Sequence, residues 1–134
     1  MANKNFNLFL NSKINNFNKT IEVDSDKSLS IRSFIIGSIC EGISSVKNVL
    51  ESDDVNHTIL ACKKLGAKIV RVRPKQYKIY GKGLGSFFIK KNSELNFSNS
   101  GTASRLLTGV LASTPNIQVT LRGDHSLNKR NMKQ

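Results

Sequence analysis

Apolar and polar positions recur along this chain of 134 residues with the periods of both helices and strands. Residues 28–41 are apolar on nearly all sides, which predicts a helix packed within a core. A second helix, with a narrow apolar stripe, is predicted to begin at Ser52, and a third, strongly amphipathic helix near Gly101. From about Ser126 the sequence predicts the start of a fourth helix.

Short runs of β-branched, aliphatic and aromatic residues lie around the predicted helices and indicate strands. These runs cover residues 6–13, 19–23, 44–50, 67–73, 76–81, 94–97 and 116–123. The runs at 67–73 and 76–81 are expected to form a hairpin joined through Pro74 and Lys75. The mixture of helices and strands predicts an α/β protein.

The order of the predicted elements repeats along the chain. Offsets of 72 to 74 residues separate the paired positions, which are Ser28 and Gly101, Val46 and Gln118, and Ser52 and Ser126. The first unit is helix, strand, helix, strand, strand, whereas the second stops inside its second helix. We therefore expect the chain to be truncated. Chance recurrence of a common arrangement is the alternative explanation.

Composition adds a strong positive charge to this picture. The chain has 21 Lys and Arg against 9 Asp and Glu, a formal net charge of +12, so its surface attracts anions of any kind. The basic residues are spread over the whole length, and the seven Phe are not interleaved with them as base-stacking platforms would be. A small stand-alone basic module that binds nucleic acid remains the alternative to a protein that binds anionic metabolites.

The two cysteines, Cys40 and Cys62, fall on apolar faces of predicted helices, where we expect both thiols to be buried. No Cys or His has the spacing of metal ligands, so no metal site is predicted.

The first ten residues are too polar for a secretory signal, and no apolar run approaches the length of a membrane span. We expect a cytoplasmic protein without a membrane partner.

Polar and basic residues gather where the predicted helices begin. The first turn of a helix presents unpaired N–H groups and the positive end of the helix dipole, which attract anions. Lys27 adds a positive charge there, Ser28 adds a hydroxyl that can cap the helix or bind the anion, and Arg32 shares a face with Ser28. The start of the first helix is thus predicted to bind an anion.

The same character recurs at two later helix starts. Asn99, Gly101 and Thr102 open the third helix, with Arg105 one turn further on, and glycine allows a ligand to approach the backbone closely. At the fourth helix, Arg130 follows Ser126 by four residues. Three such openings predict a site for several anionic groups.

Four blocks carry a resemblance to a known family. They are DKSLSIRS (26–33), LESDDVNHTILACKKLGA (50–67), NSGTASRLL (99–107) and GDHSLNKRNM (123–132). In order and spacing they resemble the enolpyruvyl transferases, specifically the 5-enolpyruvylshikimate-3-phosphate synthase family, and a related transferase acting on a UDP-sugar is a poorer match. The resemblance implies a two-domain inside-out α/β barrel of repeated βαβαββ units, with helices inside and sheets outside. Residues 1–23 would then be strands that pair with a second domain, and residues 24–134 the first unit and truncated second unit of the substrate-binding domain.

The resemblance also implies an activity. It is transfer of the enolpyruvyl group from phosphoenolpyruvate to the 5-hydroxyl of 3-phosphoshikimate, which gives 5-enolpyruvylshikimate 3-phosphate and phosphate on the route to chorismate and aromatic amino acids. No metal or organic cofactor is implied, and the two substrates would be the partners of a monomeric full-length enzyme. The acid/base residues would lie further along, so the isolated chain is expected to be inactive.

Seven residues of this chain match the family's binding motifs, and their roles follow from the resemblance alone. Ser28 and Arg32 would hold 3-phosphoshikimate, and Lys27 would touch both substrates. The residues implied for phosphoenolpyruvate are Lys27, Gly101 and Arg130, with Asn99 and Thr102 lining the same pocket.

Overall fold

The structure is a computed structural model that describes residues 24–131, so the strands predicted at 6–13 and 19–23 lie outside the described residues. Within this range the elements follow one another as α1 (Lys27–Ile39), β1 (Glu41–Val46), α2 (Asp53–Lys64), β2 (Lys68–Arg73), β3 (Gln76–Lys82), β4 (Ser93–Asn96), α3 (Gly101–Ala112), β5 (Val119–Arg122) and α4 (His125–Asn128). None of these helices is long and apolar enough to cross a membrane.

The strands form two small sheets. In the first sheet β3 lies between β1 and β2 and is antiparallel to both. The predicted hairpin is confirmed, since Arg73 pairs with Gln76 across the turn at Pro74 and Lys75. In the second sheet β4 and β5 run parallel, joined through α3. The α/β prediction is therefore confirmed.

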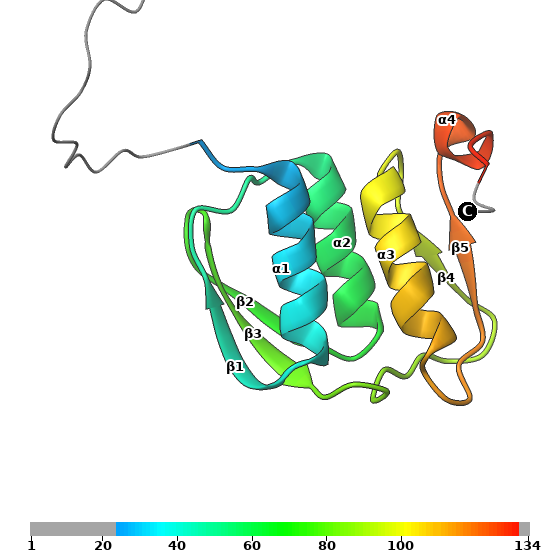
Figure 1. Cartoon of the computed structure of the whole chain (residues 1–134), viewed down its shortest axis with the longest axis horizontal. Helices are drawn as coiled ribbons and strands as arrows, with labels where there is room; N and C mark the ends of the chain where they lie inside the picture. The colour runs from blue at the N-terminus through cyan, green and yellow to red at the C-terminus, as the bar shows by residue number, and fades with distance from the viewer. Residues whose placement is uncertain (1–23, 132–134) are drawn as a thin grey trace, which may run out of the picture.

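Helices α1, α2 and α3 lie side by side, with α1 in contact with both of the others (Figure 1). Their buried side chains and those of the sheets form one hydrophobic core that spans both sheets. Phe34 of α1 is fully buried there and meets the ring of Tyr77 edge-on, with 5.1 Å between the ring centroids. Leu107 of α3 and Leu95 of β4 are also fully buried. This core fixes where the helix starts lie relative to one another.

Helix α1 is less completely buried than its sequence predicts. Ile31 and Phe34 are inaccessible to solvent, but Leu29 is 64% exposed and Ile36 is 54% exposed. The prediction of burial on nearly all sides is wrong for this outer face. The reason is that α2, α3 and β3 cover the inner side of the helix.

The passage from α1 into β1 also differs from the prediction. Cys40 ends the helix in an extended conformation, and β1 begins directly afterwards at Glu41, so the strand predicted at 44–50 is placed too late. Asn48, with φ of 56°, follows the strand's end at Val46 in a left-handed conformation that strands do not adopt. Cys40 is exposed at this junction, which corrects the expectation that it is buried.

The order helix, strand, helix occurs twice among the described elements. Helices α1 and α3 begin at Lys27 and Gly101, 74 residues apart, and α2 and α4 begin at Asp53 and His125, 72 residues apart. The strands of the two copies differ in how they pair: β1 joins an antiparallel sheet, whereas β5 joins a parallel one. Helix α4 is a single turn of four residues.

Candidate anion-binding site

The start of α1 is capped by a residue that precedes the predicted helix. The carboxylate of Asp26 accepts a hydrogen bond from the N–H of Leu29 at 2.6 Å, so Asp26, and not Ser28, caps the helix. Ser30 is buried and donates to the Asp26 carbonyl at 2.7 Å. Lys27 is the first residue of α1, and half of its side chain is exposed. Its ammonium can therefore be reached from solvent at the start of the helix.

The start of α3 brings small residues close to an arginine from a distant part of the chain. Ser100 is buried and caps α3, accepting from the N–H of Ala103 at 3.4 Å. The guanidinium of Arg130 donates to the side-chain oxygen of Asn99 at 2.6 Å. A Cβ atom built on Gly101 would lie 2.8 Å from Nη1 of Arg130. Because Gly101 has no side chain, the guanidinium can lie against the first turn of α3.

Arg130 reaches this position from beyond α4. The cap of α4 is Asp124, whose carboxylate accepts from the N–H of Leu127 at 2.7 Å, and the helix ends at Asn128. Arg130, four residues after Ser126, therefore lies past the last helical residue and not within the fourth helix. Its backbone N–H donates to the Leu127 carbonyl at 3.0 Å, which folds the chain back toward α3.

A cavity of about 350 Å³ opens between these helix starts, and we call it the anion pocket. Its lining residues come from the starts of three helices and from the segments beside α3 and α4, and they are Lys27, Asp54, Asn99, Gly101, Thr102 and Arg130. The structure thus brings together every residue that the resemblance implies for phosphoenolpyruvate. Ser28 and Arg32 do not line this pocket, and Arg105 turns instead to the carbonyl of Asn131 at 3.0 Å.

The attraction of the anion pocket for a negative ligand comes mainly from its side chains. At α1, α3 and α4 a side chain of the chain itself already accepts one of the free N–H groups, namely Asp26, Ser100 and Asp124. One free N–H group at each of these helix starts is therefore already paired within the chain. Lys27 and Arg130 supply two positive charges, which can bind a phosphate or carboxylate through charge-assisted hydrogen bonds.

Asp54 is the pocket residue that sequence reasoning missed. Its carboxylate lies 2.9 Å from the ammonium of Lys27, measured from Oδ2 to Nζ. In the sequence, Asp53 and Asp54 are explained by the helix dipole, which favours negative charge in the first turn of α2. That explanation fits Asp53, which is exposed, but only the packing of α2 against α1 brings Asp54 to Lys27.

A second polar cluster holds the segment that leads into α2, and we call it the Glu51 network (Glu51, Arg71, Lys75 and Tyr77). Both carboxylate oxygens of Glu51 accept from Arg71 at 2.8 Å, and one also accepts from the Tyr77 hydroxyl at 2.7 Å and the Lys75 N–H at 3.2 Å. These donors, Arg71 first, lower the pKa of Glu51 from 4.5 to about 2. The network therefore ties the start of α2 to the hairpin turn.

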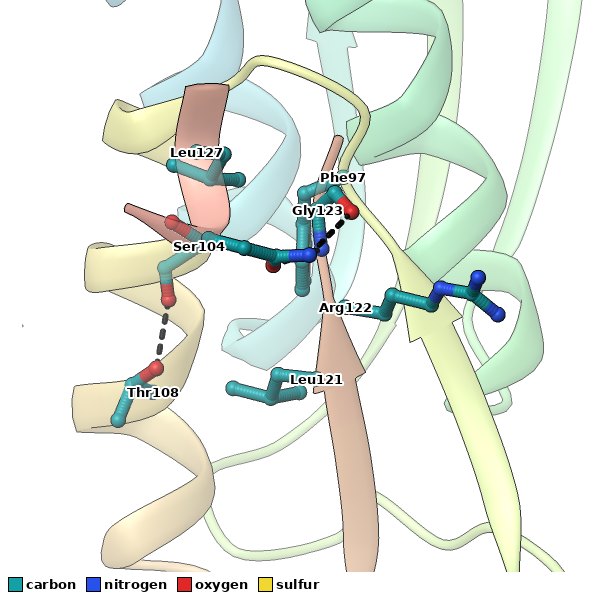
Figure 2. A pocket seen from close by; sticks show the side chains of 8 residues that line it. Phe97, Ser104, Thr108, Leu121, Arg122, Gly123 and Leu127 are labelled. Atoms are coloured by element: carbon teal, nitrogen blue, oxygen red, sulfur yellow. Dashed lines mark hydrogen bonds between the residues drawn. The ribbon is translucent and has the colours of Figure 1, made fainter. Parts of the chain in front are cut away.

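Another cavity, of about 280 Å³, lies between α3, β5 and α4 and has a different chemistry (Figure 2). Its polar side chains bond within the chain: Ser104 donates to the Gly101 carbonyl, Thr108 to the Ser104 carbonyl, and the Asn128 amide pairs with Gly123. Arg122 extends away from it, and its guanidinium lies 3.7 Å from the Glu94 carboxylate. Within the described part of the chain, Arg122 is the one charged residue in the lining of this cavity, and most of the other lining side chains are apolar or bonded within the chain.

Comparison with known proteins identifies the family. The family model described as EPSP synthase (3-phosphoshikimate 1-carboxyvinyltransferase) matches residues 11–134. Two relatives named 3-phosphoshikimate 1-carboxyvinyltransferase come from Magnetococcus marinus, 44% identical over 87% of this chain, and Oceanobacillus iheyensis, 45% identical over 84%. The chain spans 26% of the length of each, so it corresponds to about a quarter of these relatives.

Solved structures agree with the sequence comparison. The EPSP synthase from Acinetobacter baumannii superimposes with a TM-score of 0.75 and 35% identity, covering 84% of this chain and 25% of that one. Nothing in these comparisons supports the alternative of a nucleic-acid-binding module. A match over nearly the whole chain, in both sequence and structure, means that this chain belongs to the EPSP synthase family.

Proposed function

We propose that this chain supplies the anion pocket of a 3-phosphoshikimate 1-carboxyvinyltransferase. The whole reaction would move the enolpyruvyl group of phosphoenolpyruvate to the 5-hydroxyl of 3-phosphoshikimate and release phosphate. The observation that carries the proposal is the convergence of Lys27, Gly101 and Arg130 on one pocket, in a chain of this family. The cytoplasmic location and the monomeric state of a full-length protein remain predictions.

The chemistry of the substrates supports this assignment. Phosphoenolpyruvate and 3-phosphoshikimate each carry a phosphate and a carboxylate, so a site for both needs several cations. In the anion pocket the guanidinium of Arg130 would hold phosphoenolpyruvate. Gly101 leaves room for this guanidinium beside the backbone. Lys27 lines the same pocket from the start of α1, the helix from which Ser28 and Arg32 would hold 3-phosphoshikimate.

The proposed reaction balances without a metal or organic cofactor. The 5-hydroxyl oxygen bonds to C2 of phosphoenolpyruvate, C3 gains a proton, and the hydroxyl proton is lost, which gives a tetrahedral intermediate. Loss of a proton from C3 and of phosphate from C2 then restores the double bond in the product. The role of Lys27 and Arg130 would be to place the reactants and stabilise the negative charge around them.

A chimera tests the proposal directly. Residues 11–134 would replace the matching segment of the Magnetococcus marinus relative, and phosphate release would be measured with both substrates and with each alone. We expect release only when both substrates are present. A chimera that melts cooperatively but releases no phosphate would refute the proposal.

Variants of the chimera test the pocket. Arg130→Ala removes a charge-assisted contact to the ligand, and we expect kcat/KM to fall by roughly a hundredfold, about 3 kcal/mol of transition-state stabilisation. Arg122→Ala is the matched control, because Arg122 is an exposed arginine outside the anion pocket. Equal kcat/KM values for the two variants would count against the pocket as the substrate site.

A further inference from the structure

Among the described residues that line the anion pocket, Lys27 and Asp54 form an ion pair that joins the first turns of α1 and α2. Nζ of Lys27 lies 2.9 Å from Oδ2 of Asp54, and the side chains are 49% and 21% exposed. The lysine is thus the more accessible partner, and the carboxylate lies deeper. Both residues line the same pocket as Arg130.

Asp54 is the better anchored of the two residues. The segment before α2 is held by the Glu51 network and by the N–H of Leu50, which donates to the buried Ser30 hydroxyl at 3.0 Å. Within α2 the Thr58 hydroxyl donates to the Asp54 carbonyl at 2.8 Å. The short side chain of Asp54 has few rotamers, whereas the ammonium of Lys27 ends a flexible four-carbon stem. The carboxylate therefore determines where the ammonium lies.

We propose that Asp54 is a positioning residue of the anion pocket, which holds the Lys27 ammonium where a bound anion meets it. This rests on the proposed function in that it assigns a second role within the same pocket. Asp54 acts through Lys27 and does not itself touch the reacting atoms. As a negative charge beside an anion site it also repels the ligand, so its presence orders the cation while lowering the affinity for the anion.

These two effects have opposite signs, which separates positioning from a merely structural role. Asp54→Asn keeps the shape of the side chain and removes its charge. Loss of the repulsion should tighten anion binding, while loss of the ordered ammonium should slow turnover. If Asp54 only supported α2, binding and turnover would weaken together. Asp53→Asn is the matched control, because Asp53 lies in the same helical turn, is exposed and does not line the pocket.

The first arm of the test needs no enzyme activity. Inorganic phosphate would be titrated into the 134-residue chain, and the backbone amide NMR signals of Asn99, Gly101 and Thr102 would report binding. We expect Asp54→Asn to lower the dissociation constant about two- to fivefold, and Asp53→Asn to change it less than about 1.5-fold. Weaker binding by Asp54→Asn, or an equal gain with Asp53→Asn, would overturn the proposal.

The second arm uses the chimera with both substrates. We expect Asp54→Asn to lower kcat at least about tenfold without raising KM for phosphoenolpyruvate, and Asp53→Asn to leave both constants unchanged. A raised KM with unchanged kcat would contradict positioning. If the chimera with the native sequence is inactive, the proposed function fails, and the phosphate titration still decides whether Asp54 acts on a bound anion.

Discussion

The two thiols of the chain lie in opposite environments, although the sequence predicts the same for both. Cys62 is fully buried, and its burial raises the pKa of the thiol to about 12. Cys40 is exposed where α1 ends. The difference is a matter of position: Cys62 lies on the buried side of α2, whereas Cys40 lies at the exposed junction between α1 and β1.

This contrast predicts selective labelling of the native protein. A thiol reagent at pH 8 should modify Cys40 quickly and Cys62 only after unfolding, because the thiolate is the reactive form. The number of thiols modified per chain, counted with and without denaturant, measures this directly. Fast reaction of two thiols in the folded chain would contradict the burial of Cys62.

At Gly101 the structure predicts a loss of binding without a loss of stability. A methyl group there would meet the end of the flexible Arg130 side chain, which can move away at little cost to the fold. We expect Gly101→Ala in the chimera to raise KM for phosphoenolpyruvate roughly tenfold, through the lost charge-assisted contact, with less effect on 3-phosphoshikimate. Kinetics with each substrate varied in turn would measure this.

Gly109→Ala provides the control for Gly101→Ala on the same helix. A Cβ atom at Gly109 meets nothing within 4 Å, so the change should stabilise α3 by up to about 1 kcal/mol and leave KM unchanged. Thermal melting of both variants separates the two effects. A large drop in melting temperature for Gly101→Ala would show that the glycine is needed for folding and not for the ligand.

At the scale of elements, the Glu51 network joins the start of α2 to the hairpin β2–β3. Lys75 in the hairpin turn has φ of 57°, a conformation that is uncommon for a residue with a side chain. Its N–H donates to Glu51, and its carbonyl accepts from the Val49 N–H at 3.0 Å. These two bonds hold the turn in place, and with it the segment that leads to Asp54.

The low pKa of Glu51 predicts how stability depends on pH. The folded value of about 2 lies below the ordinary 4.5, so the network stabilises the fold fully above pH 4.5, and this contribution disappears as the pH falls from 4.5 toward 2. Glu51→Gln should destabilise the chain at pH 7. It should also weaken the dependence of the melting temperature on pH between 4.5 and 2. Thermal unfolding from pH 2 to pH 7 would measure this.

Glu94→Gln is the control for the Glu51 experiment. Glu94 is exposed and pairs only loosely with Arg122, at 3.7 Å. Exposed pairs of this kind contribute roughly 0 to 1 kcal/mol, so the melting temperature of Glu94→Gln should stay near that of the native chain. If Glu51→Gln and Glu94→Gln behave alike at every pH, the Glu51 network does not hold the hairpin.

At the scale of the whole molecule, a single core joins the two copies of the helix, strand, helix order. Leu107 of α3 belongs to the same cluster of buried residues as Phe34 of α1, and the two helices are in contact. We therefore expect the described part of the chain to unfold as one cooperative unit. The anion pocket depends on this, because its cations come from both copies.

Leu107→Ala tests the cooperativity. The substitution leaves a cavity in the core, and we expect it to destabilise the chain by about 2 to 5 kcal/mol. The chain has no Trp and two Tyr, Tyr77 and Tyr80, which both lie in β3, so tyrosine fluorescence reports the first copy alone. Leu107→Ala should shift the unfolding transition seen by tyrosine fluorescence as far as the transition seen by far-UV circular dichroism. If the fluorescence transition stayed at its native midpoint, the two copies would be independent.

Much of the fold could be predicted from local pattern. The start of α2 after Ser52, the hairpin at Pro74 and the start of α3 at Gly101 depend on residues close in sequence, and the structure confirms each of these positions, although the Ser52 hydroxyl makes no capping hydrogen bond. The boundaries of β1 and the exposed face of α1 could not be predicted in the same way. Both depend on which neighbours are present, and sequence periodicity does not reveal those neighbours.

The sequence by itself determined the α/β class, the positive charge and the family motifs that contain Lys27, Gly101 and Arg130. These are properties of single residues and short blocks, so they can be read without knowing how the chain folds. Only the tertiary structure decided that these residues share one pocket, that Arg130 donates a hydrogen bond to Asn99, and that Asp54 forms an ion pair with Lys27. The physical reason is that such contacts join distant segments, and packing in the common core alone fixes their distances.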